Sequence, residues 1–150
     1  MLISIITCTC NSDEFLEEAL LSYQNQNHRE KELIIIDGAS TDNTLAIIDK
    51  YNSACHILVT EKDKGIYDAL NKGIANSSGE VIGILHSDDL FYNEQVLSSV
   101  NRMFVEDAQL EAVYGDLQYV KRDEPDKLVR NWVSGPCKAG KLSLGWMPPH

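Results

Sequence analysis

Residues 81–89 read VIGILHSDD, a short apolar run that ends in two adjacent carboxylates. The apolar residues predict a buried strand over 81–85, because short apolar runs bounded by turn residues are typical of parallel sheets. At the exit of such a strand, Asp88 and Asp89 repel each other, and burial adds to the cost of their charge. A divalent cation relieves this repulsion, since hard cations take oxygen ligands and bridge carboxylates to phosphate groups. The stretch therefore predicts a buried strand that is followed directly by a metal site.

The same alternation of strand and helix runs through the N-terminal part of the chain. Apolar, β-branched runs predict further strands over 2–9, 33–36 and 56–60. Apolar stripes at helical spacing follow the four strands, over 15–23, 45–51, 66–74 and 96–104. This order predicts an α/β fold with a mostly parallel central sheet and flanking helices.

The pattern changes to short strands in the C-terminal part. Runs over 112–114, 117–121 and 128–132 predict a meander, and residues 134–150 predict no regular structure. At the helix starts, we expect Asn11 or Ser12 to cap the helix at 15–23. We likewise expect the segment 40–44 to supply capping oxygens to the helix at 45–51.

Polar residues gather where the predicted strands end. Thr7 to Asn11 follow the first strand, and Asp37 and Asp63 follow the next two, ahead of Asp88 and Asp89. Since ligands bind beyond the carboxyl ends of parallel strands, we expect these residues to share one crevice. Taken alone, these acidic residues also have structural interpretations. Asp37 could begin an Asx turn, and Asp88 and Asp89 could be loop and helix-cap residues. Nearby, Asp42 could cap a helix, and His86 could be an ordinary polar residue at the end of a strand.

The charge of the chain excludes several classes of partner. Its 150 residues carry 23 acidic and 13 basic side chains, a net charge of −10, which repels nucleic acid and anionic membrane surfaces. No apolar stretch approaches the ~20 residues that span a bilayer, and the first residues lack a basic leader and a cleavage site. We expect a cytoplasmic protein with reduced, buried thiols, because no paired metal spacing joins its cysteines, Cys8, Cys10, Cys55 and Cys137.

Four motifs together resemble those of the family-2 glycosyltransferases. They read ISIITCTCN over 3–11, IIDGASTD over 35–42, DKGIYDALNKG over 63–73 and GEVIGILHSDD over 79–89. Their order and spacing match the family across residues 1 to about 95. The resemblance implies the GT-A fold, a Rossmann-like nucleotide-diphospho-sugar transferase fold, in an enzyme that often builds bacterial surface polysaccharides.

The resemblance also implies a role for each site residue. Thr7, Thr9 and Cys10 would lie along the nucleotide base and ribose, and Asp37 would accept a hydrogen bond from the base. Asp63 and Gly65 would border the nucleotide pocket. Asp88 would face the ribose or the metal, and Asp89 would be a ligand of Mn²⁺ or Mg²⁺. The donor would be a UDP-sugar, and the acceptor a saccharide or a lipid-linked molecule, with inversion at the transferred sugar.

The chain departs from the family pattern at several positions. Cys10 replaces an aromatic residue that stacks on the base, Leu70 stands where an arginine is frequent, and His86 replaces the first acid of the metal motif. Residues 146–150 resemble the entrance to the acceptor-side half of the family. We therefore expect a nucleotide-sugar-binding domain over 1–133, a truncated acceptor-side region over 134–150, and a general base beyond His150. Peripheral membrane association of the full-length protein is left open.

Other functions are compatible with parts of this pattern. A non-catalytic nucleotide-sugar-binding module would share the site and lack the base. A receiver-type signalling domain also has an acidic pocket on an α/β sheet, but it needs acids after the first strand, where Thr7 to Cys10 stand. A dinucleotide enzyme would need a glycine-rich fingerprint after that strand, and the sequence has none there.

Overall fold

A computed structural model describes residues 1–121, 124–136 and 140 of the chain. The chain divides into two compact units, residues 1–106 and 107–150. The first unit carries all the site residues predicted from the sequence. Whether the nucleotide-sugar-binding domain ends at residue 133 stays a prediction.

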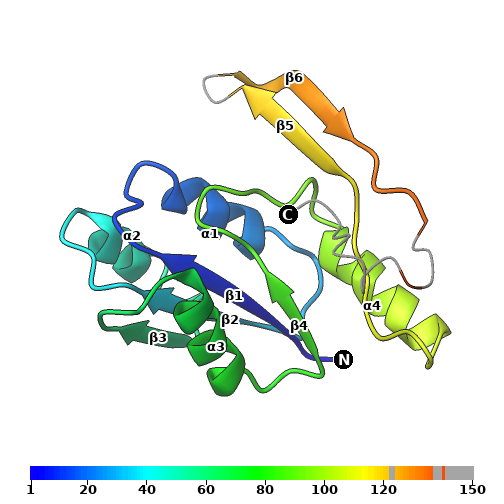
Figure 1. The fold of residues 1–150 in the computed structure, drawn as a ribbon, viewed down its shortest axis with the longest axis horizontal. Coiled ribbons are helices and arrows are strands. Elements are labelled where there is room, and N and C mark those ends of the chain that lie inside the picture. Colours follow the sequence, from blue (N-terminus) through cyan, green and yellow to red (C-terminus); the bar gives the residue numbers. More distant parts are fainter. Residues whose placement is uncertain (122–123, 137–139, 141–150) are drawn as a thin grey trace. The chain divides into compact units, whose positions relative to one another are not determined.

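Strands and helices alternate strictly through the first unit (Figure 1). The predicted order is therefore confirmed, with boundaries within a few residues of those expected. The elements are β1 (Ile3–Thr9), α1 (Leu16–Gln24), β2 (Lys31–Asp37), α2 (Thr44–Lys50), β3 (Ile57–Thr60), α3 (Ile66–Asn76), β4 (Val81–Ile84) and α4 (Val96–Glu106).

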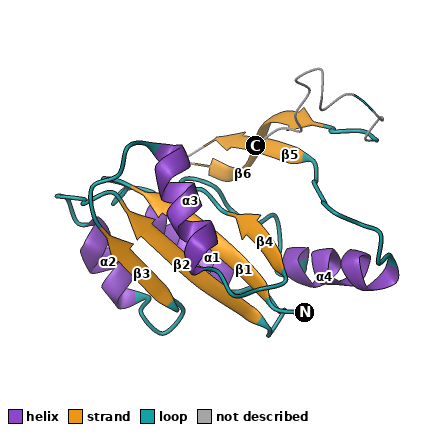
Figure 2. Cartoon of the chain, turned by 60° about the horizontal axis from the view of Figure 1, so that its bottom comes forward, coloured by secondary structure: helices purple, strands orange, loops and turns teal. Residues whose placement is uncertain are grey.

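The four strands form one parallel sheet in the order β3-β2-β1-β4 (Figure 2). In the register, Thr9 of β1 pairs with Asp37 of β2, and Asp37 pairs with Thr60 of β3. On its other side, β1 pairs with β4, with Ile6 opposite Ile84. The strand order thus reverses between β1 and β4, which is the place where such sheets bind ligands.

Side chains alternate between the two faces of the sheet, and each face has its own core. Ile3 and Ile5 of β1 pack with α1, α2 and α4 through residues such as Leu20, Ile48 and Leu97. Among the described residues, the other face packs against α3, through Ile6, Cys8, Ile34, Ile36 and Ala69. Helices on both faces leave the carboxyl ends of the strands as the surface available to a ligand.

The packing of α3 on the sheet depends on a glycine. A Cβ atom at Gly73 would overlap Cγ2 of Ile6 in β1, so only a residue without a side chain lets the helix approach this closely. Because α3 is fixed here, its N-terminal end is held beside the ends of β1 and β2.

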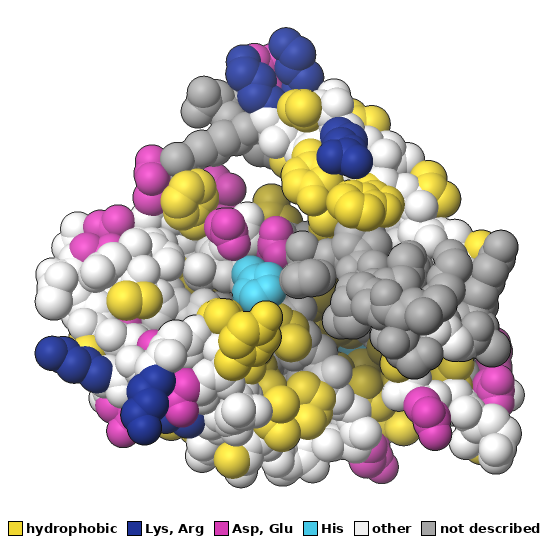
Figure 3. Space-filling model, in the orientation of Figure 1, with side chains coloured by type: hydrophobic (Ala, Val, Ile, Leu, Met, Phe, Trp, Pro, Cys, Tyr) yellow, Lys and Arg dark blue, Asp and Glu magenta, His cyan; other side chains and the backbone are white. Residues whose placement is uncertain are grey.

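A hydrophobic surface remains exposed on the first unit. Figure 3 shows hydrophobic side chains gathered over β4 and the neighbouring side of α3. Ile82 and Ile84 of β4 are 43% and 51% exposed, and Ile74 of α3 is 48% exposed. Among the described residues, β4 is an edge of the sheet.

The second unit contains an antiparallel hairpin, β5 (Leu117–Lys121) and β6 (Glu124–Trp132), with Leu117 opposite Trp132. The strand predicted over 112–114 is wrong, because this segment is irregular and pairs with no strand in the described part of the chain. The strand predicted at 128–132 begins earlier, at Glu124. Residues 134–136 are irregular, as predicted. The predictions for Cys137 and for 146–150 lie outside the described residues.

Across the residues that the structure describes, no helix is both long and apolar enough to span a membrane.

Candidate functional site

The loops that follow β1 and β4 meet at the point where the strand order reverses. The Ser87 hydroxyl donates a hydrogen bond to Oγ of Ser12 at 3.2 Å. The N–H of Leu85 donates to the carbonyl oxygen of Ile6 at 3.0 Å, which continues the pairing of the two strands. The segment that carries Asp88 and Asp89 is therefore tied to the loop that carries Cys10.

Asp37 is fully buried and organises the loop after β2. Its carboxylate accepts hydrogen bonds from the backbone N–H of Ser40, at 3.1 Å to Oδ2, and from the Ser40 hydroxyl. Oγ of Ser40 in turn accepts the N–H of Asn11 at 2.8 Å, and Oδ1 of Asn11 accepts the N–H of Thr41 at 2.9 Å. These contacts correspond to the alternative in which Asp37 shapes a turn. Its contact with a base stays a prediction.

The capping prediction is wrong for α1. At α2 the residue before the helix, Asn43, forms no side-chain capping bond, but another residue of the predicted segment supplies an acceptor oxygen. Asp42 Oδ1 accepts the N–H of Thr44, the first residue of α2, at 3.0 Å. No side chain caps α1, whose preceding residue is Phe15. The physical reason is competition: Asn11 Oδ1 accepts the N–H of Thr41, and the Ser12 hydroxyl bonds to the carbonyl oxygen of Cys10 and to the Ser87 hydroxyl. Contacts between loops have displaced the local cap.

The three predicted residues at the end of β1 differ in exposure. Thr7 and Thr9 are buried, and their Oγ1 atoms have no hydrogen-bond partner among the described residues. Cys10 is exposed, so the expectation that the thiols are buried is wrong for this residue. Its position just beyond the last sheet residue, Thr9, turns it away from both cores. Cys8 is buried, and burial, with the nearby charge of Asp63, raises its pKa to about 11.

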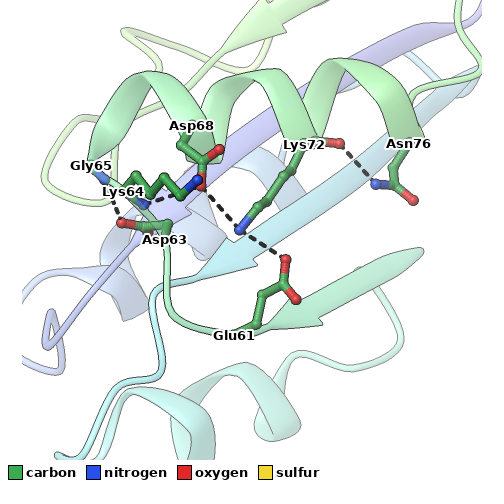
Figure 4. Close-up of polar contacts among 7 residues, drawn as sticks. All are labelled: Glu61, Asp63, Lys64, Gly65, Asp68, Lys72 and Asn76. Atoms are coloured by element: carbon green, nitrogen blue, oxygen red, sulfur yellow. Dashed lines mark hydrogen bonds and ion pairs between the residues drawn. The ribbon is translucent and has the colours of Figure 1, made fainter.

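Asp63 and Gly65 form a tight turn at the start of α3 (Figure 4). Gly65 has a φ of 107°, a conformation that favours glycine, and its N–H donates to Asp63 Oδ1 at 2.9 Å. Asp68 Oδ2 accepts the N–H of Lys64 at 3.1 Å, and Lys72 pairs with Asp68 at 3.2 Å. The hydrogen bond from Lys64, with the charge of Lys72, lowers the pKa of Asp68. The turn is thus rigidly held.

Asp63, Gly38 and Cys10 converge although they follow three different strands. A Cβ atom placed on Gly38 would lie 2.9 Å from Asp63 Oδ2 and 3.3 Å from Cys10 Sγ. Cys10 and Asp63, from the expected set, therefore lie close together, while a shared crevice for all the strand-end residues stays a prediction. Gly38 belongs to one of the four motifs, but no signal in the sequence indicates that its backbone lies between a thiol and a carboxylate.

Asp88 and Asp89 lie in a turn directly after β4. The N–H of Asp89 donates to the carbonyl oxygen of His86 at 3.1 Å. Asp88 is exposed and Asp89 is partly buried. Burial raises the pKa of Asp89, the charge of Asp88 raises it further, and His86 partly offsets both. A carboxylate that resists ionisation beside a second carboxylate is suited to binding a cation.

No group of three or more His, Cys, Asp or Glu side chains in the described part of the chain is arranged to hold a metal ion. A cation held by the Asp88 and Asp89 pair would therefore take its other ligands from elsewhere. Mg²⁺ is commonly held by one or two carboxylates together with substrate phosphates and water, so the donor set fits such an ion.

Comparison with known proteins agrees with this architecture. A model of glycosyl transferase family 2 matches residues 4–145. The PGL/p-HBAD biosynthesis glycosyltransferase of Mycobacterium bovis is 33% identical over 117 residues, covering 76% of this chain and 46% of the relative. TuaG of Bacillus subtilis, named for teichuronic acid biosynthesis, is 31% identical over 98 residues, covering 63% of this chain and 39% of the relative.

Solved structures give the same fold. TarS of S. aureus in complex with UDP-GlcNAc has a TM-score of 0.65 and 28% identity, covering 71% of this chain and 32% of that protein. The mannosyltransferase PcManGT of Pyrobaculum calidifontis, in complex with GDP-Man and Mn²⁺, has a TM-score of 0.65 at 24% identity, covering 80% of this chain and 35% of that protein.

The α/β sheet and the acidic strand ends thus define a nucleotide-sugar transferase fold of the GT-A type. The chain belongs to glycosyl transferase family 2. This membership confirms the resemblance seen in the sequence and removes the receiver-domain and dinucleotide-enzyme alternatives. The chain spans less than half the length of the curated relatives that it matches.

Proposed function

We propose that the chain is the donor-binding part of a cytoplasmic glycosyltransferase that uses a UDP-sugar and a divalent cation, Mn²⁺ or Mg²⁺. The sugar would pass to a saccharide or lipid-linked acceptor with inversion. The observation that carries the proposal is the Asp88 and Asp89 pair at the point where the strand order reverses, with a raised pKa on Asp89. The UDP-GlcNAc bound by TarS, at 28% identity, supports the donor class.

Asp89 would hold the cation and Asp88 would face the cation or the ribose. Bound there, a divalent cation supplies positive charge to the leaving diphosphate, whose negative charge grows as the bond to the sugar breaks. The protein contributes a fixed geometry. The hydrogen bonds from Asp89 to His86 and from Ser87 to Ser12 hold the turn in place before the donor arrives.

The nucleoside would lie at the ends of β1, β2 and β3. Cys10 and the backbone of Gly38 offer a contact surface, and Asp63 and Gly65 border it. Thr7 and Thr9, both buried, would support this surface from below. The base that removes the proton of the acceptor hydroxyl is proposed to come from the part of the relatives that this chain does not span.

Calorimetry tests this proposal directly. UDP should bind the chain more tightly with Mn²⁺ than without it, and Asp89→Ala should remove the effect of the metal. Asp49→Ala, at an exposed position on α2, is the matched control and should bind UDP as the wild type does. Binding of UDP that is indifferent to both Mn²⁺ and Asp89→Ala would overturn the proposed metal site.

A non-catalytic nucleotide-sugar-binding module is the second candidate. It would bind the nucleotide-sugar at the same strand ends, with the same Asp88 and Asp89 pair, without transferring the sugar. The two candidates separate in a chain extended to the full length of its relatives. Release of UDP from a UDP-sugar, with or without an acceptor, supports the enzyme, whereas tight UDP binding without turnover supports the module.

A further inference from the structure

Gln26, between α1 and β2, is a buried residue whose side-chain amide is hydrogen-bonded through both its nitrogen and its oxygen. The residue is 5% exposed. Nε2 donates to the carbonyl oxygens of Asn93, at 2.6 Å, and Ser22, at 3.4 Å, and Oε1 accepts the N–H of Leu97 at 3.0 Å. Ser22 lies in α1, Asn93 in the segment between the proposed metal site and α4, and Leu97 in the first turn of α4. One side chain therefore joins three parts of the chain.

Two further contacts join the same parts. The N–H of Asn27 donates to the carbonyl oxygen of Glu94 at 2.9 Å, and the N–H of Phe91 donates to Oγ of Ser22 at 3.3 Å. Phe91 also packs against the core cluster that contains Leu97. The segment that follows the proposed metal site is thus fixed to the end of α1 at several successive positions.

The carboxylates of the proposed metal site have no such support. Those of Asp88 and Asp89 accept no hydrogen bond from any residue in the described part of the chain, so their positions depend on the backbone. On one side of the pair, the N–H of Leu85 bonds to Ile6 of β1. On the other side, the backbone is held through Gln26. Because adjacent carboxylates repel each other, a backbone that was free at either end would let them separate.

We propose that Gln26 is a positioning residue for the divalent cation: by fixing the backbone that follows Asp89, it holds the carboxylates of Asp88 and Asp89 together before the cation and the donor bind. This inference rests on the proposed function of the pair. Mg²⁺ demands a nearly ideal arrangement of its oxygen ligands. A site that is arranged in advance loses less freedom when the cation arrives, so it binds more tightly. Residues that only orient metal ligands commonly change metal affinity by about 10- to 100-fold.

The contacts of Gln26 call for an amide. Two carbonyl oxygens need donors and one N–H needs an acceptor, and a primary amide presents both from one group. Methionine has a similar length, but its thioether donates no hydrogen bond and accepts one only weakly. In Gln26→Met, Asn93 and Leu97 therefore lose their buried partner. The segment after the proposed metal site keeps its contacts with Asn27 and Ser22.

The response of UDP binding to the metal separates positioning from stability. Calorimetry would measure UDP affinity with and without Mn²⁺ at a temperature where each variant is folded, and the ratio of the two affinities is the metal factor. A residue that only stabilises the fold leaves the metal factor of the folded molecules unchanged. Gln26→Met should lower the metal factor by about 10-fold.

Ile3→Val is the control for lost stability. It removes a buried methyl group from the first residue of β1, at the opposite end of the strand from the site. It should lower the stability of the fold and keep the wild-type metal factor. A metal factor that falls as much in Ile3→Val as in Gln26→Met would show that the loss follows stability, and it would overturn the proposal.

Ser22→Ala is a milder variant that loosens the same segment. It removes the acceptor of the Phe91 N–H and leaves the amide of Gln26 in place, so the metal factor should fall by a smaller amount. A wild-type metal factor in Gln26→Met overturns the proposal, and where that variant does not fold, a wild-type metal factor in Ser22→Ala does so. If UDP binding by the wild type does not respond to Mn²⁺, the proposed metal site fails and the role of Gln26 fails with it. If the wild type responds and Gln26→Met responds equally, only the role of Gln26 fails.

Discussion

The hydroxyl of Ser87 donates a hydrogen bond to the hydroxyl of Ser12 at 3.2 Å, although the two residues lie 75 positions apart in the sequence. Ser12 donates in turn to the carbonyl oxygen of Cys10 at 3.4 Å. This chain of hydrogen bonds joins the segment before Asp88 to the end of β1. It therefore connects the proposed metal side of the site with the proposed base side.

Ser87→Ala should weaken the binding of UDP with Mn²⁺ and lower the free energy of unfolding by about 1 kcal/mol, because it removes one partly buried hydrogen bond. Ser12→Ala should cost more, because it also removes the hydrogen bond to the carbonyl oxygen of Cys10, and the double variant should add little to Ser12→Ala, since the bond lost in Ser87→Ala is already gone there. Ser53→Ala, at an exposed serine, is the control. Additive losses in urea denaturation would show that the two hydroxyls do not act together.

Asp89→Asn should stabilise the chain at neutral pH in the absence of metal. Burial and Asp88 raise the pKa of Asp89 in the folded state, so its stabilising contribution is present below the pKa of the unfolded chain and is lost as the pH rises through the folded value. The gain should appear as the pH rises through the folded pKa of Asp89 and should vanish below the ordinary aspartate pKa of about 3.9. Urea denaturation across this range would measure it. A gain that is independent of pH would show that ionisation of Asp89 is not its source.

Asp37→Ala should destabilise the fold by about 2 kcal/mol or more, because it leaves the N–H and hydroxyl of Ser40 without their buried acceptor. The exposed Asp49→Ala should change stability by no more than about 0.5 kcal/mol. Both values come from urea denaturation at neutral pH. Equal stability of the two variants would mean that the Asp37 network contributes nothing to the fold.

The strands and helices of the first unit could be predicted because each is encoded locally. Apolar, β-branched runs such as Ile3–Ile6 and Leu33–Ile36 have no other way to bury their side chains, and the helices repeat apolar residues at the period of a helix. The carboxyl-end placement of Asp37, Asp63 and Asp89 followed from the parallel order of the strands. These features need no knowledge of loop geometry.

The hydrogen bonding and exposure of each site side chain could not be predicted in the same way. Asp37 ends β2 and Asp63 follows β3, yet both oxygens of Asp37 accept hydrogen bonds from Ser40, whereas Oδ1 of Asp63 accepts one from Gly65. That difference depends on how two loops fold against each other. The same cause explains why the predicted caps are wrong: Asn11 Oδ1 accepts the N–H of Thr41 in the loop after β2, and the Ser12 hydroxyl bonds to Ser87 and Cys10. Contacts between distant loops carry no periodic signal in the sequence.

Gly73→Ala should destabilise the fold by about 1–3 kcal/mol, because the added methyl group overlaps Ile6 and must displace α3 or distort the core. Asn71→Ala, at an exposed position on the same helix, is the control and should be neutral or slightly stabilising. Since α3 begins at the Asp63 and Gly65 turn, Gly73→Ala should also reduce UDP affinity. Thermal unfolding with and without UDP would measure both effects, and a fully stable Gly73→Ala would contradict the close packing of α3 on β1.

The exposed edge of the sheet should make the chain self-associate. Ile82 and Ile84 expose apolar side chains on β4, whose outer backbone groups pair with no other strand among the described residues. The double substitution Ile82→Lys and Ile84→Lys should lower the average mass measured by light scattering at high protein concentration, because charged side chains oppose strand pairing. Leu21→Lys, at a 45% exposed leucine on α1, is the matched control and should not change the mass. A wild-type chain that stays monomeric at every concentration, or a control that dissociates it equally, would show that this edge does not drive association.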